Sequence, residues 1–204
     1  MKILFFLFVC IFHVTILAAQ QLITPYENSK GTETTTYEAC ISFYKKLAKQ
    51  YPQVTLKKMG KTDAGYPLHL VVYEKNDNTN IRPKLTILIN NGIHAGEPDG
   101  VDASMLFLRD IVTGKIAFPS QLRLAIIPFY NIGGALNRGS YSRVNQEGPL
   151  AYGFRGNAQN LDLNRDFTKC DSENAKSFAA IFHWLKPHIL LDTHVSDGAD
   201  FQHT

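Results

Sequence analysis

Apolar side chains recur at helical spacing in three stretches of the sequence. Their positions, three or four residues apart, predict amphipathic helices at Thr36–Gln50, Val101–Val112 and Ser172–Lys186. Thr35 and Glu38 match a capping box at the start of the first helix. Pro52, Gly114 and Pro187 follow the three helices, at places where these residue types commonly end a helix.

Short apolar runs predict five strands: Val54–Met59, Tyr66–Tyr73, Leu85–Ile89, Leu122–Ile127 and Ile189–Leu191. The turn at Asp63-Ala64-Gly65 predicts that the first two strands form a hairpin. The third and fourth strands flank a predicted helix, and this strand–helix–strand unit is typical of a mixed or parallel sheet. The last run predicts one more buried strand. The order of the elements therefore predicts an α/β fold.

The loop predicted between residues 131 and 171 is long for a compact domain. It contains six glycines and is rich in Asn and Arg. Loops of this length are uncommon unless they serve a function or are disordered. Since this loop lies between two core elements, we expect it to form one wall of a site.

The first 19 residues have the layout of a secretory signal peptide. Met1-Lys2 gives a positively charged start, Ile3–Leu17 is almost entirely apolar, and Ala18-Ala19 supplies small residues for cleavage. The apolar run is too short for a membrane anchor. We expect a secreted or periplasmic protein without membrane association after cleavage, with residues 20–33 as an extended lead-in to the domain.

Composition excludes two classes of protein. Of the 204 residues, 45% are hydrophobic and 19% are charged, which excludes a disordered chain. The 21 Lys and Arg against 18 Asp and Glu include no basic run, so nothing supports nucleic-acid binding. Beyond the predicted signal peptide, Cys40 and Cys170 fit either one disulfide bond in an oxidising compartment or two buried free thiols.

Three side chains at predicted strand ends suggest a metal site. His94 and Glu97 follow the strand Leu85–Ile89, and His194 follows Ile189–Leu191. In open α/β sheets, ligands bind beyond the carboxyl ends of the strands. Two imidazoles and one carboxylate form a donor set for one catalytic Zn²⁺ with an open position for water. The competing interpretation is a polar loop with a helix-capping carboxylate and structural histidines.

Three motifs, in this order, resemble the zinc carboxypeptidase family. They are His94-Ala95-Gly96-Glu97, Asp162-Leu163-Asn164-Arg165 and Asp192-Thr193-His194. The resemblance implies a catalytic domain over residues 34–204, with a mixed, mostly parallel central sheet flanked by helices. It also implies one Zn²⁺ bound by His94, Glu97 and His194, the ligand set known for carboxypeptidase A, and hydrolysis at the C-termini of peptides or proteins.

The resemblance also assigns roles to residues of the second motif. Asn164 and Arg165 match the pair that binds the terminal carboxylate of the substrate, and a planar guanidinium suits that bidentate contact. The alternative for Arg165 is a structural ion pair with Asp162 or Asp166. Asp162 matches the carboxylate that hydrogen-bonds a zinc-binding histidine, which predicts a contact with His94.

A further arginine should stabilise the oxyanion formed on the attacked carbonyl group. Arg143 is the candidate because of its place before the second motif, and Arg138 and Arg155 are its rivals. The family often carries Asn-Pro-Asp-Gly after the preceding strand. This chain has Asn131-Ile132-Gly133-Gly134 instead, so the path of the loop is expected to differ.

A larger departure concerns the general base. In the family, a catalytic Glu and a substrate-covering Tyr come from a later strand and loop, whereas no Glu follows Glu173 in this chain. We therefore expect a C-terminally truncated form that lacks the catalytic Glu. Two other interpretations stay open: a zinc amidohydrolase or deacylase acting on N-acyl amino acids or cell-wall peptides, and a non-catalytic zinc-containing binding module.

Overall fold

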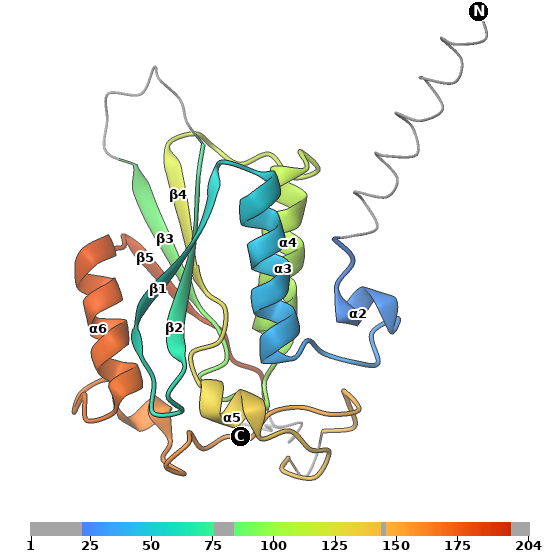
Figure 1. Cartoon of the computed structure of the whole chain (residues 1–204), viewed down its shortest axis with the longest axis vertical. Helices are drawn as coiled ribbons and strands as arrows, with labels where there is room; N and C mark the ends of the chain where they lie inside the picture. The colour runs from blue at the N-terminus through green and yellow to red at the C-terminus, as the bar shows by residue number, and fades with distance from the viewer. Residues whose placement is uncertain (1–21, 76–83, 144–145, 197–204) are drawn as a thin grey trace, which may run out of the picture.

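A mixed sheet of five strands lies at the centre of the protein (Figure 1). The computed structural model describes residues 22–75, 84–143 and 146–196, so the predicted signal peptide lies outside the described residues. The strands are β1 (Val54–Lys61), β2 (Pro67–Glu74), β3 (Leu85–Asn90), β4 (Leu122–Ile127) and β5 (Ile189–Asp192). Their order across the sheet is β1-β2-β4-β3-β5.

Strand direction confirms the predicted mixed α/β sheet. β2 runs antiparallel to β1 and β4, while β3 runs parallel to β4 and β5, so every strand except β2 points the same way. The register places Asn90 opposite Ile127 on one side and Asp192 on the other. The carboxyl ends of β3, β4 and β5 therefore meet at one edge of the sheet, as the strand–helix–strand pattern predicts.

Helices cover both faces of the sheet. α3 (Tyr37–Gln50) and α4 (Asp99–Val112) pack side by side on one face, and α6 (Glu173–Leu185) lies on the other (Figure 1). The three predicted helices are therefore confirmed, with small shifts at their ends. Within the described ranges, no helix is long and apolar enough to cross a bilayer.

The side chains of β2 alternate between the two faces of the sheet, which explains why helices pack on both faces. Val71 and Tyr73 pack into the cluster formed with α3 and α4, whereas Leu70 and Val72 pack into the cluster formed with α6. Successive side chains of a strand point to opposite faces, so an apolar run like this one must be buried on both sides. The sheet is thus the middle layer of three.

The start of α3 differs by one residue from the prediction. The N-cap is Thr36, whose hydroxyl accepts a hydrogen bond from the Ala39 N–H, so the predicted capping box of Thr35 and Glu38 is wrong. The reason is tertiary: Thr35 is buried, and its N–H donates to Asp102 of α4.

The lead-in before α3 contains one turn of helix where the sequence predicts extended chain. This helix, α2 (Pro25–Asn28), has Thr24 as its N-cap and carries a full capping box with Glu27. Glu27 also pairs with Arg109 of α4 at 2.6 Å, which ties the lead-in to the domain.

In the described part of the chain, β5 lies at the edge of the sheet with its apolar side chains exposed, so the prediction of a buried strand at Ile189–Leu191 is wrong for this structure. Among the described residues, β5 pairs with β3 alone. The exposed fractions of Ile189, Leu190 and Leu191 are 57%, 43% and 51%. An apolar run predicts a strand equally well at the centre or at the edge of a sheet, so the pattern could not locate it.

The two cysteines of the described chain are free thiols, so the disulfide interpretation is wrong. Cys40 lies on α3 inside the core, where burial, with a smaller effect from Asp102, raises the pKa of its thiol well above the usual value. Cys170 is half-buried in the loop before α6.

The long loop from residue 131 to 171 lies over the carboxyl edge of the sheet (Figure 1). It contains α5 (Ile132–Leu136) and the 3₁₀ turn η1 (Leu163–Arg165). Gly133, which departs from the family pattern, and Gly134, which matches its last glycine, both have a steric reason. A Cβ at Gly133 would lie 2.4 Å from the Ala158 nitrogen, and one at Gly134 would lie 2.2 Å from the Phe154 oxygen.

His69 makes the stability of the fold sensitive to acid. It lies buried on β2, and its Nδ1 is 3.2 Å from the Tyr37 hydroxyl. Burial, helped by the charges of Lys58 and Lys45, lowers the pKa of His69 from 6.5 to about 4. Between these two values the unfolded chain binds the proton and the folded chain does not, so the free energy of unfolding falls as the pH falls.

We expect this histidine alone to remove about 2.5 kcal/mol of stability between pH 7.5 and 4.5. Urea unfolding at the two pH values measures the fall in the free energy of unfolding. In a His69→Gln variant this fall should be smaller by about the same 2.5 kcal/mol. Equal losses in both proteins would contradict the prediction.

Candidate metal centre

The structure brings together the three candidate metal ligands predicted from the sequence. His94 and Glu97 lie in the loop between β3 and α4, and His194 follows β5. One ligand atom from each residue lies within 4.8 Å of the other two. They meet because β3 and β5 are neighbouring parallel strands whose carboxyl ends are in register. The predicted convergence at this sheet edge is therefore present.

Both imidazole rings face Glu97 through the same ring atom. His94 Nδ1 lies 3.0 Å from Glu97 Oε1, and His194 Nδ1 lies 3.2 Å from Glu97 Oε2. The two ring centroids are 5.1 Å apart, with the rings nearly perpendicular. The N–H of Val195 donates to Glu97 Oε2 at 3.0 Å, so this carboxylate also holds the chain after β5.

Each ring has a second carboxylate on its far side. Asp162 Oδ1 lies 3.1 Å from His94 Nε2, and Asp192 Oδ2 lies 2.9 Å from His194 Nε2. Both nitrogens of each ring therefore face a carboxylate, and the tautomer decides which one carries the hydrogen. In the tautomer with hydrogen on Nε2, toward Asp162 or Asp192, the two Nδ1 atoms are available to a metal ion. The Asp162 contact was predicted. The Asp192 contact was not, although its position two residues before His194, on the same strand end, was a usable signal.

Glu97 is the most buried charge of the cluster. Burial by itself would raise the pKa of Glu97, but hydrogen bonds with His94 and the Val195 N–H, together with the charges of His94 and Arg143, lower it to about 2. Arg143 Nη1 lies 2.9 Å from Glu97 Oε1. Glu97 is thus an anion over the whole ordinary pH range.

The three candidate arginines differ in their contacts with the cluster. Arg138 donates to the carbonyl oxygens of residues 34, 35 and 151, so it holds the loop rather than the cluster. Arg143 contacts Glu97, and 9% of its side chain is exposed. Arg155 is 48% exposed and pairs with Asp162 at 2.8 Å. Two arginines therefore reach the cluster, and Arg143 is the more enclosed.

The Asp162 carboxylate links the cluster to the predicted carboxylate-binding pair. It accepts a hydrogen bond from the Asn164 N–H and so caps η1. Although burial opposes the shift, hydrogen bonds with Arg155, Asn164 and His94 lower the pKa of Asp162. Asn164 and Arg165 therefore lie two and three residues after a residue that contacts His94.

Arg165 makes neither of the structural ion pairs considered for it. In the described part of the chain, its guanidinium donates to the Asn164 carbonyl oxygen at 3.0 Å and is otherwise exposed. Asp162 pairs with Arg155, and Asp166 accepts hydrogen bonds from Ser172 and the Asp171 N–H. The charge of Arg165 is thus available to an external anion.

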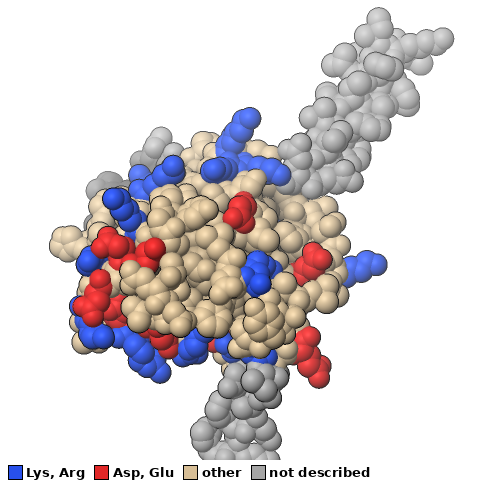
Figure 2. Space-filling view, turned by 60° about the horizontal axis from the view of Figure 1, so that its bottom comes forward, with Lys and Arg blue, Asp and Glu red and all other residues tan. Residues whose placement is uncertain are grey.

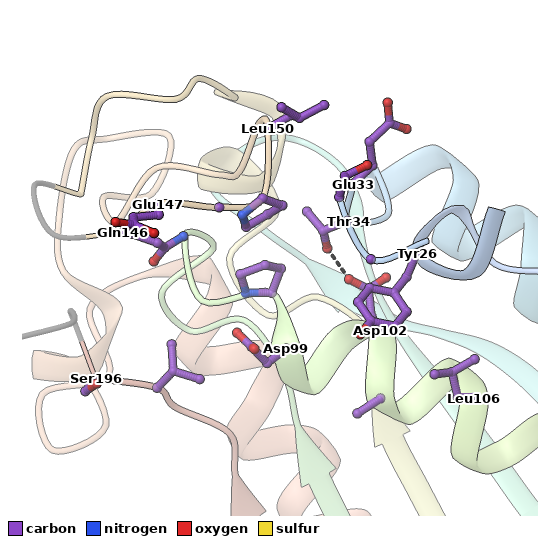
Figure 3. A pocket seen from close by; sticks show the side chains of 17 residues that line it. Tyr26, Glu33, Thr34, Asp99, Asp102, Leu106, Gln146, Glu147, Leu150 and Ser196 are labelled. Carbon is purple, nitrogen blue, oxygen red and sulfur yellow. Dashed lines mark hydrogen bonds between the residues drawn. The ribbon is translucent and has the colours of Figure 1, made fainter. Parts of the chain in front are cut away.

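A groove of about 1000 Å³ lies beside the cluster (Figure 3). Pro98 and Val195, the neighbours of Glu97 and His194, form part of its lining, together with residues of the lead-in and of α4. Among its described lining residues, every charged one is acidic: Glu33, Asp99, Asp102 and Glu147. Figure 2 shows that both acidic and basic side chains lie on one face of the molecule.

Comparison with known proteins identifies the family. Residues 40–183 match the zinc carboxypeptidase family, and the chain belongs to it. Carboxypeptidase 2 of Trichophyton equinum is 23% identical over 174 residues, and its counterpart in Trichophyton rubrum is 22% identical. These matches cover 81% of this chain and 30% of each relative, so the chain spans less than a third of the curated relatives' length.

Solved structures show the same fold. A metallo-carboxypeptidase from Burkholderia cenocepacia has a TM-score of 0.62 at 18% identity, covering 81% of this chain and 42% of that one. Thrombin-activatable fibrinolysis inhibitor has a TM-score of 0.63 at 19% identity, covering 90% and 54%. At these identities the likeness concerns the fold, and it agrees with the predicted sheet and its flanking helices.

Proposed function

We propose that this chain carries the metal centre of a zinc-dependent carboxypeptidase that removes residues from peptide C-termini. The observation that supports the proposal is the cluster of His94, Glu97 and His194 within 4.8 Å, in a member of the zinc carboxypeptidase family. The donor set fits one Zn²⁺, since it offers two imidazole Nδ1 atoms and one carboxylate kept ionised. Bound there, Zn²⁺ would lower the pKa of a water molecule and polarise the scissile carbonyl group.

The remaining residues supply substrate binding. Asn164 and Arg165 would hold the terminal carboxylate, because the Arg165 guanidinium is exposed and unpaired with the nearby aspartates in the described structure. Arg143 would donate to the oxyanion, since its buried Nε has no partner among the described residues. The acidic groove next to Val195 has room for the rest of the peptide.

The general base is proposed to come from outside the described residues. The three carboxylates that contact the cluster histidines are Glu97, Asp162 and Asp192, and hydrogen bonds to imidazole, guanidinium or amide groups already engage each of them. A base must reach the attacking water with a free lone pair. We also propose a secreted or periplasmic location, on the strength of the signal-like residues 1–19.

The test of the function uses two preparations. The printed chain should bind one Zn²⁺ per molecule by elemental analysis. The longest reading frame that contains it should shorten free peptides from the C-terminus, as seen by mass spectrometry, and leave C-terminally amidated peptides intact. Hydrolysis of N-acyl amino acids without peptide shortening would replace the proposal with an amidohydrolase, and zinc binding without either reaction would replace it with a binding module.

A further inference from the structure

We infer that Asp192, held in place by Asn90, is the positioning residue for the His194 ring. This inference rests on the proposed function, because it concerns how the chain orients a candidate zinc ligand. It adds Asp192 and Asn90 to a site in which the sequence motifs assign a carboxylate partner only to His94.

The arrangement follows from strand register. Asn90 on β3 and Asp192 on β5 are partners in a parallel pair, so their side chains lie on the same face of the sheet. The Asn90 amide Nδ2 donates to Asp192 Oδ1 at 3.0 Å. Asp192 Oδ2 is then left for His194 Nε2 at 2.9 Å. One carboxylate therefore joins a buried amide to the imidazole, with a separate oxygen for each.

His194 needs such a partner more than His94 does. Only 4% of the His94 side chain is exposed, so packing restrains that ring, whereas 33% of His194 is exposed at the end of an edge strand. The backbone there is already held, because the Thr193 N–H donates to the Asn90 carbonyl oxygen at 3.1 Å. Rotation of the His194 ring about its side-chain bonds is the freedom that remains, and the contact with Asp192 restricts it.

The contact also selects the ring atom that binds metal. Since Asp192 can only accept, it favours hydrogen on Nε2 of His194 and leaves Nδ1 toward Glu97. Partners of this kind typically contribute 10–100-fold to metal affinity. Each candidate ligand histidine then has its own carboxylate, Asp162 for His94 and Asp192 for His194.

Two substitutions at Asp192 distinguish a role in positioning the His194 ring from a role in stability alone. Asp192→Ala removes the acceptor. Asp192→Asn can keep both contacts, because its carbonyl oxygen can accept from His194 while its amide donates to the Asn90 Oδ1 atom, which has no partner in the described structure. Asp171→Ala is the control, since Asp171 is an exposed carboxylate paired only loosely with Lys169, at 3.7 Å.

The readouts are Zn²⁺ affinity by competition with a chromophoric chelator, the visible spectrum of the Co²⁺-substituted chain, and thermal unfolding of the metal-free chain. We expect Asp192→Ala to weaken Zn²⁺ binding about 10–100-fold and to alter the Co²⁺ spectrum. Asp192→Asn should recover most of the affinity and the spectrum, and without metal it should unfold at a temperature close to that of the unmodified chain. Asp192→Ala should unfold at a lower temperature, because it leaves the buried Asn90 amide without its partner.

Equal affinity of Asp192→Ala and Asp171→Ala would overturn the inference. The inference would also be overturned if Asp192→Asn did not restore the Zn²⁺ affinity lost in Asp192→Ala and both variants lost metal-free stability to a matching extent. Failure of the unmodified chain to bind Zn²⁺ at all would instead remove the proposed function, and the inference with it. The unmodified chain thus tests the function, and the comparison among variants tests the positioning role.

Discussion

A His94→Ala/His194→Ala variant should lose stoichiometric zinc binding. Structural zinc sites with four ligands bind with about 10–16 kcal/mol, so each ligand contributes roughly 3 kcal/mol and two together about 10⁴-fold in affinity. The two rings supply both Nδ1 atoms that face Glu97, and Glu97 alone would remain. Dialysis against micromolar Zn²⁺ followed by elemental analysis measures the result.

His183→Ala is the matched control for this variant. His183 is exposed in the last turn of α6 and is not a member of the cluster, so it should be replaceable without effect on zinc. One bound Zn²⁺ per molecule in the double variant would rule out these histidines as the ligands. Loss of zinc in His183→Ala would show that the assay reports folding instead of ligation.

Replacing Arg165 with Ala should weaken the binding of peptides with a free C-terminus by about 10–100-fold. A charge-assisted, bidentate contact between guanidinium and carboxylate contributes roughly 1.5–3 kcal/mol. Arg165→Lys keeps the charge without the planar pair of donors, so its loss should be intermediate. The measurement is peptide affinity by fluorescence anisotropy on the zinc-loaded chain.

Amidated peptides provide the internal control. They lack the carboxylate, so the unmodified chain and Arg165→Ala should bind them equally weakly. Arg123→Ala, which removes a guanidinium paired with Glu74 on the sheet away from the cluster, should leave both affinities unchanged. If Arg165→Ala weakened free and amidated peptides to the same extent, the carboxylate-binding role would be wrong.

Much of the fold could be predicted because its core strands and helices are strongly patterned. The hairpin of β1 and β2 and the unit of β3, α4 and β4 follow from local apolar periodicity and turn residues. The prediction failed where tertiary contacts decide. The Thr35 N–H donates to Asp102, and the N-cap of α3 is Thr36 instead of Thr35. The burial of β5 depends on what lies beside it, which a run of three apolar residues does not encode.

The candidate site was predictable to the extent that its residues sit at strand ends. His94, Glu97 and His194 each follow a recognisable strand, so their convergence could be expected. The arginines could not be distinguished because they lie in a loop whose path depends on close backbone approaches, such as Gly133 against Ala158. The Asp192 contact depends on strand register between β3 and β5, which the sequence alone leaves undetermined.

The pairing of β5 with β3 links metal occupancy to the position of a strand. Strands differ in the free energy at which they open locally. Since His194 directly follows β5, each opening of this strand withdraws one of the three donors from the cluster. An ion bound by all three donors would favour the closed form by mass action and so hold the end of β5 against β3. The metal would then contribute to the pairing of two strands as well as to the chemistry of the site.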